Sequence, residues 1–457
     1  MTTMIQERPV LSLEPVQTVD KQHQAPTPSP VDIKTYNTSD IVVSEVNASD
    51  TDMTETICEG SLVPTRASSA TSLAASTTSS ATDASPTSTA PSTVSDDLSY
   101  QSEKPSQEVS GPSKPTHNVL LITPERGYAL TTGFPAPTAA SLESTEVMIR
   151  NKAAGLNHID WMSVAYNFCL PTLPWVTGRE MAGVVEAVGT DVTGVRPGDA
   201  VWTTTYYKDR RAGCFQGLVI VPQHTVFPIP ATLDFCTAAC LGVAGVTAAM
   251  TLWQWLNVSM EAAAPSETAD TKEDKEVLLV WGGSTVTGQF AIQLAAQAGL
   301  EVVAVCSTAT EALVRSRGAT HVVTYTGKTD MHVIGEILCC AGGRLTRAID
   351  LVGAKTAKLV LQVIAASGRT VDFAPLAFMS SKDVVPVNAK VHTVEIKQFV
   401  LNEASGVYGQ RLNELVASGA VKLPAVRVLE GGLAAVEQGL AMVKEGNLDG
   451  KKLVVSF

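Results

Sequence analysis

The chain has 457 residues, enough for two domains and an unstructured segment, because domains commonly span about 100 to 200 residues. Its formal net charge of −12 disfavours binding to nucleic acids and to anionic membranes. No uninterrupted apolar run reaches the roughly 18 residues of a membrane span, and no secretion signal is recognisable at the start of the chain. A cytoplasmic protein that does not bind membranes is therefore expected.

The cysteine pattern does not predict a metal site. No two cysteines have the C-x-x-C spacing that presents two thiolates to one metal ion. Cys236 and Cys240 could share one helical face, which is typical of packing. The eight cysteines are Cys58, Cys169, Cys214, Cys236, Cys240, Cys306, Cys339 and Cys340.

Residues 1 to 115 are expected to form a disordered tail. Between Ala67 and Ser95 nearly every residue is Ala, Ser, Thr, Pro or Val, and such a composition buries too little apolar surface to offset the entropy of ordering. A mitochondrial targeting peptide is the alternative. Glu7, Glu14 and Asp20 oppose it, because transit peptides contain few acidic residues.

A β-rich unit is expected from residue 116 to about residue 240. Short apolar segments separated by Gly and Pro turns predict its strands. Helical spacing then runs from Leu233 to Leu256, and Gly242 and Gly245 interrupt it, which predicts two helices with a bend between them. The strands are expected at Asn118 to Ile122, Val147 to Ala153, Gly183 to Val188, Ala200 to Thr203 and Gly217 to Val221.

Strands and helices alternate after Glu276, which predicts a parallel sheet with helices on both faces. The ligand of such a sheet is expected at the carboxyl ends of the strands, where the strand order reverses. The final strand, Lys452 to Ser456, is expected to return to the β-rich unit. The other strands are expected at Val277 to Trp281, Glu301 to Cys306, His321 to Thr324, Ala348 to Leu351 and Gly368 to Phe373.

A glycine-rich turn follows the first strand of this alternating region. The segment Val280-Trp281-Gly282-Gly283-Ser284-Thr285-Val286-Thr287-Gly288 connects a strand to a helix. Glycines here allow a tight turn and let backbone N–H groups approach a pyrophosphate at the helix N-terminus. Thr285 replaces the middle glycine of the dinucleotide fingerprint, so a hydroxyl near the phosphates is expected.

The end of the next strand favours NADP(H) over NAD(H). An acidic residue about 20 residues past the glycine turn would bind the ribose 2′-hydroxyl of NAD. Cys306 and Ser307 stand there instead, and a 2′-phosphate can accept hydrogen bonds from Ser307, Thr308 and Thr310. Arg315 is a further candidate for this phosphate.

From Asn118 to Phe457 the sequence resembles the medium-chain dehydrogenase/reductase family. The resemblance is carried by Gly155-Leu156-Asn157-His158-Ile159-Asp160-Trp161, Gly178-Arg179-Glu180-Met181-Ala182-Gly183, Val195-Arg196-Pro197-Gly198-Asp199-Ala200-Val201, the glycine turn and Arg317-Gly318-Ala319. It implies an α/β fold with a GroES-like, β-rich catalytic domain and a Rossmann-type, doubly wound parallel sheet. The implied boundaries are 116–240 for the first part of the GroES-like domain, 241–389 for the Rossmann domain and 390–457 for the return to the substrate domain.

The zinc alcohol dehydrogenases of that family have a Cys at the position of Asn157 and a His at the position of Arg179. An amide and a guanidinium are poor zinc ligands, so no zinc is expected. The sequence is more similar to the zinc-independent branch of quinone reductases and enoyl reductases. Its Gly-Gly-Ser-Thr turn most resembles the fungal enoyl reductases that act in trans on polyketide synthases.

This resemblance implies the positions of the cofactor and of the acyl pocket. NADPH would be held by Asn157, His158, Ile159, Asp160, Ser284, Thr285, Val286, Thr287, Ser307, Thr308, Ala309, Thr310, Tyr325, Leu453, Val454 and Val455. The pocket would be lined by Gly242, Val243, Ala244, Gly245, Val246, Thr247, Ala248 and Ala249. The sequence also allows a purely packing role for His158.

The expected reaction is hydride transfer from NADPH to an α,β-unsaturated thioester or a related carbonyl compound, in secondary metabolism. Tyr166, Tyr206 and Tyr207 are candidate proton donors, and Tyr166 is the predicted one because it is nearest to Asn157 in sequence. A quinone or enone reductase and a non-catalytic, NADPH-binding partner of a larger synthase are the alternatives. A polyketide synthase is the expected partner, and the sequence leaves the substrate and the oligomeric state open.

Overall fold

The structure is a computed structural model that describes residues 115–263 and 275–457. The predicted tail lies outside the described residues, apart from Pro115. Seven strands form one mixed sheet, and three more form a small antiparallel sheet in the order β2-β1-β4. The large sheet consists of β3 (Glu146–Gly155), β5 (Glu180–Val188), β6 (Ala200–Thr204), β7 (Leu218–Pro222), β8 (Val226–Pro228), β15 (Val426–Leu429) and β16 (Lys452–Ser456), and the small one of β1 (Thr116–Ile122), β2 (Tyr128–Pro135) and β4 (Trp175–Val176).

Helices and the C-terminal strand complete the β-rich part. Helix α10 (Leu433–Glu445) contributes Val436 and Leu440 to the buried cluster that also contains Val147 and Ile149 of β3. Strand β16 pairs antiparallel with β3 and parallel with β15, so the last strand belongs to the same sheet as the first part of this unit. Three shorter helices complete it: α1 (His158–Tyr166), α8 (Gln398–Leu401) and α9 (Gly406–Ala417).

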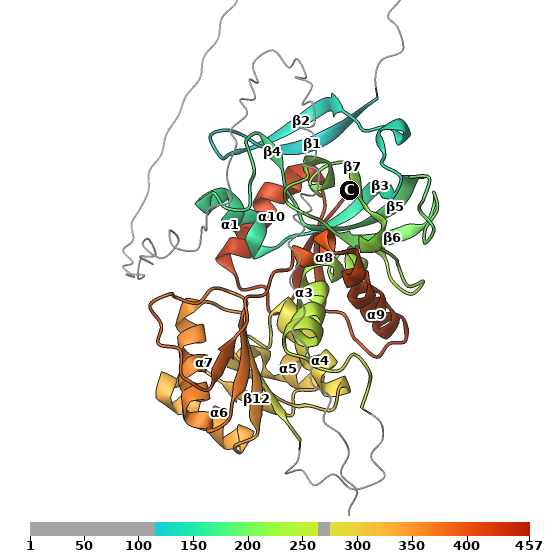
Figure 1. The fold of residues 1–457 in the computed structure, drawn as a ribbon. Helices are drawn as coiled ribbons and strands as arrows, with labels where there is room; N and C mark the ends of the chain where they lie inside the picture. Colours follow the sequence, from blue (N-terminus) through green and yellow to red (C-terminus); the bar gives the residue numbers. More distant parts are fainter. Residues whose placement is uncertain (1–114, 264–274) are drawn as a thin grey trace, which may run out of the picture. The chain divides into compact units, whose positions relative to one another are not determined.

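A six-stranded parallel sheet follows in the order β11-β10-β9-β12-β13-β14. This is the doubly wound order, in which the direction of strand addition reverses between β9 and β12. The helices α6 and α7 lie against one face of the sheet (Figure 1). The elements are β9 (Val277–Trp281), β10 (Glu301–Cys306), β11 (His321–Thr324), β12 (Leu345–Asp350), β13 (Val371–Pro375), β14 (Ala389–Val391), α4 (Val286–Gln297), α5 (Glu311–Ser316), α6 (Asp330–Ala341) and α7 (Ala354–Ser367).

Strand β9 shows why both faces of this sheet are covered. All five of its side chains are buried. Leu278 and Val280 pack in the cluster that includes α4, whereas Val277, Leu279 and Trp281 pack in the cluster that includes α6 and α7. Alternate side chains of a strand point to opposite faces, so a strand that is apolar throughout requires a layer on each side.

The stretch from Leu233 to Leu256, expected to form two helices with a bend between them, contains two α-helices joined through a π-helical turn that includes Gly242 and Gly245. One helical segment runs from Phe235 to Trp255 through α2 (Phe235–Ala238), a π-helical turn (Leu241–Gly245), α3 (Val246–Met250) and a second π-helical turn (Thr251–Trp255). The glycines serve close packing: a Cβ at Gly242 would meet the carbonyl oxygen of Thr203 at 2.4 Å, and one at Gly245 would meet Leu412 Cδ2 at 2.8 Å. The backbone at Thr203 therefore requires glycine at position 242, whereas at position 245 a larger residue would require the Leu412 side chain to shift.

By length and composition the same helix, with a mean hydropathy of 1.8, would be sufficient to cross a membrane. However, 72% of its most apolar window is buried inside the protein. Leu241, Met250 and Leu252 are among the largest fully buried side chains. Its apolar character is thus accounted for by contacts with the rest of the core.

Candidate functional site

The glycine turn lies at the carboxyl end of β9, beside the point where the strand order reverses. Gly282 has a φ of 91°, a left-handed conformation that favours glycine. A Cβ at Gly288 would lie 2.4 Å from the carbonyl oxygen of Gly282, so the first turn of α4 packs directly on the loop. Ser284, Thr285, Val286 and Thr287 are half-buried. The first turn of α4 therefore presents backbone N–H groups and a partial positive charge of the kind that suits a pyrophosphate, and the binding itself stays a prediction.

The Thr285 side chain has a local structural role. It is the N-cap of α4, and its Oγ1 accepts the Gly288 N–H at 3.0 Å. The hydroxyl expected near the phosphates is thus engaged in capping the helix, which satisfies one of the free N–H groups of the first turn. Thr285 and Gly288 together fix the turn in its bent form.

The predicted 2′-phosphate residues gather at the ends of the neighbouring strands. Ser307 Oγ and Thr310 Oγ1 lie 3.0 Å apart directly after β10, and Tyr325 follows β11, its N–H donating to the Cys306 carbonyl at 3.1 Å. Arg315 pairs with Glu311 one turn earlier, at 2.7 Å, so much of its charge is already balanced. The role of the hydroxyl groups at this edge in binding a 2′-phosphate stays a prediction.

The remaining predicted cofactor residues lie in the β-rich part. Asn157 caps α1 in a box with Asp160, whose Oδ2 accepts the Asn157 N–H at 2.9 Å. Leu453, Val454 and Val455 are at most 1% exposed and are paired with the neighbouring strands β3 and β15, so their contact with a cofactor stays a prediction. The Leu156 N–H donates to the Leu453 carbonyl at 3.0 Å, which makes these two segments neighbours.

One polar side chain connects the β-rich part to the glycine turn. Gln289 Nε2 donates to the carbonyls of Ser284, at 3.0 Å, and of Gly450, at 2.7 Å. Gly450 comes two residues before Lys452, the first residue of β16. The segment that leads into β16 is thus tied directly to the turn.

The structure brings five polar residues together into a buried charge cluster: Asn157, Asp160, Arg179, Glu180 and Lys452. Lys452 is 3% exposed, and its Nζ forms a close ion pair with Glu180 Oε1 and donates to Asn157 Oδ1 at 2.7 Å. Asn157 Nδ2 donates to Glu180 Oε1 at 2.9 Å. A buried cation is tolerated because a carboxylate and an amide replace its lost hydration.

Arg179 forms the second half of the charge cluster. Its NH2 group donates to Ser163 Oγ at 2.7 Å, and its Nε lies 3.5 Å from Asp160 Oδ1. The guanidinium carbon lies 5.5 Å from the centroid of the Tyr207 ring. Neither Arg179 Nε nor Asp160 Oδ1 has a hydrogen-bond partner among the described residues.

Burial determines the protonation behaviour around the charge cluster. Complete burial raises the pKa of Asp160 to about 6, although Arg179 and the Asn157 N–H act in the opposite direction. Desolvation and the nearby Lys452 charge lower the pKa of His158, and Trp161 Nε1 lies 3.3 Å from His158 Nδ1. His158 is therefore neutral near pH 7.

The predicted pocket helix presents few side chains to a ligand. Between Gly242 and Ala249 only Val243 and Thr247 are half-buried, and the other six residues are buried. Val243 and Thr247 are four residues apart, so they lie on the same face of the helix. The Val243 N–H, in the π-helical turn, donates to Glu180 Oε2 at 2.6 Å. The pocket helix is thus hydrogen-bonded to the charge cluster. The pocket role of the segment stays a prediction, now centred on Val243 and Thr247.

The three candidate tyrosines differ in their surroundings. Tyr166 ends α1, is 55% exposed and has its ring 6.0 Å from that of Trp161. Tyr207 lies beneath Arg179, and burial raises its pKa to about 12. Tyr206 stacks beside Tyr207 at 4.8 Å. Tyr166 as the proton donor stays a prediction.

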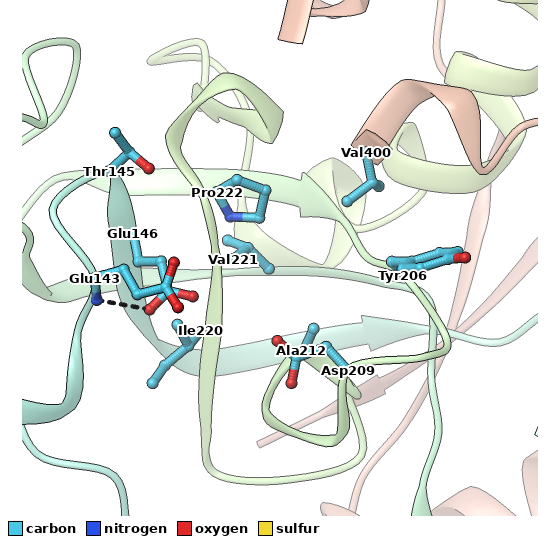
Figure 2. A pocket seen from close by; sticks show the side chains of 10 residues that line it. All are labelled: Glu143, Thr145, Glu146, Tyr206, Asp209, Ala212, Ile220, Val221, Pro222 and Val400. Carbon is cyan, nitrogen blue, oxygen red and sulfur yellow. Dashed lines mark hydrogen bonds between the residues drawn. The ribbon is translucent and has the colours of Figure 1, made fainter. Parts of the chain in front are cut away.

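A cleft of about 230 Å³ in the β-rich part contains none of the predicted cofactor residues (Figure 2). Two of its acidic side chains are paired: Arg211 NH2 lies 2.7 Å from Glu146 and 3.0 Å from Asp209. Arg211 therefore offsets part of the negative charge of the cleft. Its lining consists of Glu143, Thr145, Glu146, Tyr206, Asp209, Ala212, Ile220, Val221, Pro222 and Val400.

Known families match both parts of the chain. Residues 143–231 match the alcohol dehydrogenase GroES-like domain, and residues 287–414 match the zinc-binding dehydrogenase domain. The dehydrogenase azaJ of Aspergillus niger is 30% identical over 356 residues, which are 74% of this chain and 99% of that protein. The chain belongs to the medium-chain dehydrogenase/reductase family. It is therefore an oxidoreductase of the NAD(P)-dependent type.

Other members of the medium-chain dehydrogenase/reductase family extend the comparison. The trans-enoyl reductase iccB of Talaromyces variabilis is 28% identical over 372 residues, 74% of this chain and 95% of that protein. A quinone oxidoreductase of Pseudomonas syringae pv. Tomato DC3000 superposes with a TM-score of 0.59 at 21% identity, covering 75% of this chain and all of the other. The CurK enoyl reductase superposes with a TM-score of 0.59 at 18% identity, covering 74% of this chain and 99% of the other. The predicted α/β fold is confirmed.

The donor set of this medium-chain dehydrogenase/reductase does not fit a catalytic zinc ion. Asn157 stands at the position of a cysteine ligand, and its amide oxygen already accepts from the Lys452 ammonium. Arg179 stands at the position of a histidine ligand and carries its own positive charge. The Arg179 guanidinium at one position and the Lys452 ammonium bound to Asn157 at the other would repel a divalent ion. Within residues 115–263 and 275–457, no three or more His, Cys, Asp or Glu side chains lie close enough together to hold a metal ion.

The sequence motifs indicated part of the charge cluster. They contain Asn157, Asp160, Arg179 and Glu180, whereas Lys452 is predicted only as the first residue of a strand. The signal for Arg179, Glu180 and Lys452 was a charged residue at the start of a segment that is otherwise apolar. Such a residue is buried only when a partner of opposite charge meets it, and that partner is distant in sequence.

Proposed function

We propose that this protein is an NADPH-dependent reductase of α,β-unsaturated thioesters that acts without zinc. The observation that carries the proposal is the edge of the six-stranded sheet, where the glycine turn lies beside the Ser307 and Thr310 hydroxyl pair. Hydroxyl donors suit a 2′-phosphate, and no carboxylate stands at the end of β10 to repel it. When bound, NADPH supplies the hydride.

The names of several relatives support the thioester substrate. Three fungal relatives 27–28% identical to this chain are trans-enoyl reductases, and each is covered over 95% of its length or more. We therefore propose that the substrate is an acyl group presented by a carrier domain of a polyketide synthase, in secondary metabolism and in the cytoplasm. The chain's own contribution is orientation, exclusion of water and hydrogen bonding to the substrate oxygen.

Substrate comparison with purified full-length protein tests the proposal. NADPH oxidation is followed with crotonyl-pantetheine and, in parallel, with a para-quinone. We expect turnover of the thioester and a kcat/KM for it at least tenfold above that for the quinone. Turnover of the quinone alone would identify a quinone reductase, and tight NADPH binding without turnover of any electrophile would identify a non-catalytic partner.

Cofactor preference and metal content are measured on the same sample. NADPH should bind at least tenfold more tightly than NADH, because only the former bears the phosphate that the hydroxyls recognise. Elemental analysis should detect less than stoichiometric zinc. One tightly held zinc per chain would contradict the zinc-free part of the proposal.

A further inference from the structure

Arg179 has unused hydrogen-bonding capacity in the protein interior. A guanidinium has five N–H donors. The side chain of Arg179 is 10% exposed, yet one hydrogen bond is found for it within the described residues, to Ser163 Oγ, and its Nε has no partner. Asp160 balances the charge from 3.5 Å, which is too long for a hydrogen bond. Buried charged groups are normally saturated with hydrogen bonds, so these spare donors indicate a ligand oxygen.

The location of Arg179 is compatible with a substrate. It directly precedes Glu180, which accepts the N–H of Val243 on the predicted pocket helix. On its other side Asp160 belongs to the cap of α1, where cofactor contacts are predicted. The Arg179 guanidinium therefore lies beside the helix expected to contact NADPH, and the next residue in the chain, Glu180, contacts the helix expected to line the acyl pocket.

We propose that Arg179 is a catalytic residue that hydrogen-bonds the thioester carbonyl oxygen and stabilises the enolate. This inference rests on the proposed function. The β-carbon receives the hydride with its electron pair, the C=C π electrons move to form the C=C bond of the enolate, and the carbonyl π electrons move to the oxygen. The resulting negative charge lies against the guanidinium. A proton from a donor or from water then adds to the α-carbon, which restores the thioester and leaves NADP⁺.

The other basic side chains nearby, Lys452 and His158, are less suited to this role. Lys452 is already bound by Glu180 and Asn157, and neutral His158 carries no charge to offer. The positive charge of Arg179 is balanced by the Asp160 carboxylate, which does not hydrogen-bond the Arg179 Nε–H. A preorganised donor in a site of low dielectric stabilises developing charge without reorganisation.

Kinetics with Arg179→Gln provide the first test. We expect kcat for crotonyl-pantetheine to fall about 10²- to 10³-fold, as for loss of an oxyanion donor, while the Kd for NADPH changes less than about twofold. Arg150→Gln removes a surface arginine that pairs with Glu186 in the same domain, and it should leave both values unchanged. A kcat for Arg179→Gln within threefold of wild type would overturn the inference.

The second test does not depend on turnover. Acetoacetyl-pantetheine ionises to an enolate that is visible by ultraviolet absorbance, so its apparent pKa can be measured on the protein without NADPH. Wild type should lower that pKa by at least one unit, and Arg179→Gln should abolish the shift. An unshifted pKa on wild type, or an equal shift on the variant, would refute the role of Arg179. Absence of wild-type turnover with crotonyl-pantetheine would instead refute the proposed function.

A double variant separates the loss of the Arg179 hydrogen bond from a loss of folding. Arg179→Gln leaves the Asp160 carboxylate buried without its cation, whereas the double variant Asp160→Asn/Arg179→Gln removes both charges. We expect the double variant to keep the wild-type thermal midpoint more closely and still to lack the enolate shift. A double variant that folds and retains the shift would also overturn the inference.

Discussion

The edge of the six-stranded sheet and the buried charge cluster differ in how their polar groups are arranged. The sheet edge uses backbone N–H groups, a capped helix and hydroxyls such as Ser307 and Thr310, none of which carries a charge. The charge cluster uses two cations and two carboxylates that are at most 8% exposed. The sheet edge thus offers neutral hydrogen-bonding groups, whereas the charges of the cluster are largely balanced by one another.

This difference has a consequence for stability. A neutral hydroxyl at the sheet edge loses little when its neighbour changes, because water can replace a partly exposed partner. A buried charge that loses its partner retains its full desolvation penalty. Substitutions in the charge cluster should therefore affect folding, and substitutions at the sheet edge should affect cofactor choice.

Lys452→Met should produce the largest effect. It leaves the Glu180 carboxylate fully buried without its cation, and breaking such a pair costs about 3 to 5 kcal/mol. The free energy of unfolding is measured by urea denaturation. Lys451→Met is the matched control, because Lys451 is exposed, and it should change stability by less than about 0.5 kcal/mol. Equal losses for the two variants would remove the distinction between the charge cluster and the surface.

Asp350 allows a smaller, pH-dependent test. It ends β12 next to Trp281, is fully buried, and burial raises its pKa to about 6. The folded state thus retains a proton that the unfolded chain releases near pH 4, so this residue's contribution to stability falls as pH rises from about 4 to 6. Relative to wild type, Asp350→Asn should gain on the order of 3 kcal/mol between pH 4 and 7.

The measurement for Asp350 is the difference in unfolding free energy between variant and wild type across this pH range. Exposed Asp191→Asn serves as the control and should give a flat difference. A flat difference for Asp350→Asn as well would show that Asp350 is ionised in the folded protein with no penalty.

Ser307→Asp should have the smallest energetic effect and the most specific one. The new carboxylate would repel a 2′-phosphate, so the Kd for NADPH should rise about tenfold, or roughly 1.4 kcal/mol, with little change for NADH. Fluorescence titration measures both constants. Ser316→Asp, at the exposed end of α5, should alter neither. Equal weakening of both cofactors would contradict the assignment of the 2′-phosphate site.

The elements that the sequence predicted best are those with a strong local signal. The bounds expected for β9, β10, β11 and β16 agree with the structure, because each is a short apolar run between turn residues. Strands β2 and β15 were not predicted, since most of their side chains are exposed or half-buried and show no apolar alternation. The domain boundary expected after residue 240 falls within the helix from Phe235 to Trp255 and stays a prediction.

By itself, the sequence determined the two-part α/β fold, the position of the glycine turn and the absence of a carboxylate at the end of β10. These depend on interactions between residues close in the chain, such as Thr285 with Gly288. Only the tertiary structure decided that Lys452 meets Asn157 and Glu180, that Arg179 retains free donors, and that Gly242 and Gly245 lie within a helix. Those features arise from contacts between segments up to 295 residues apart, whose distances no local pattern records.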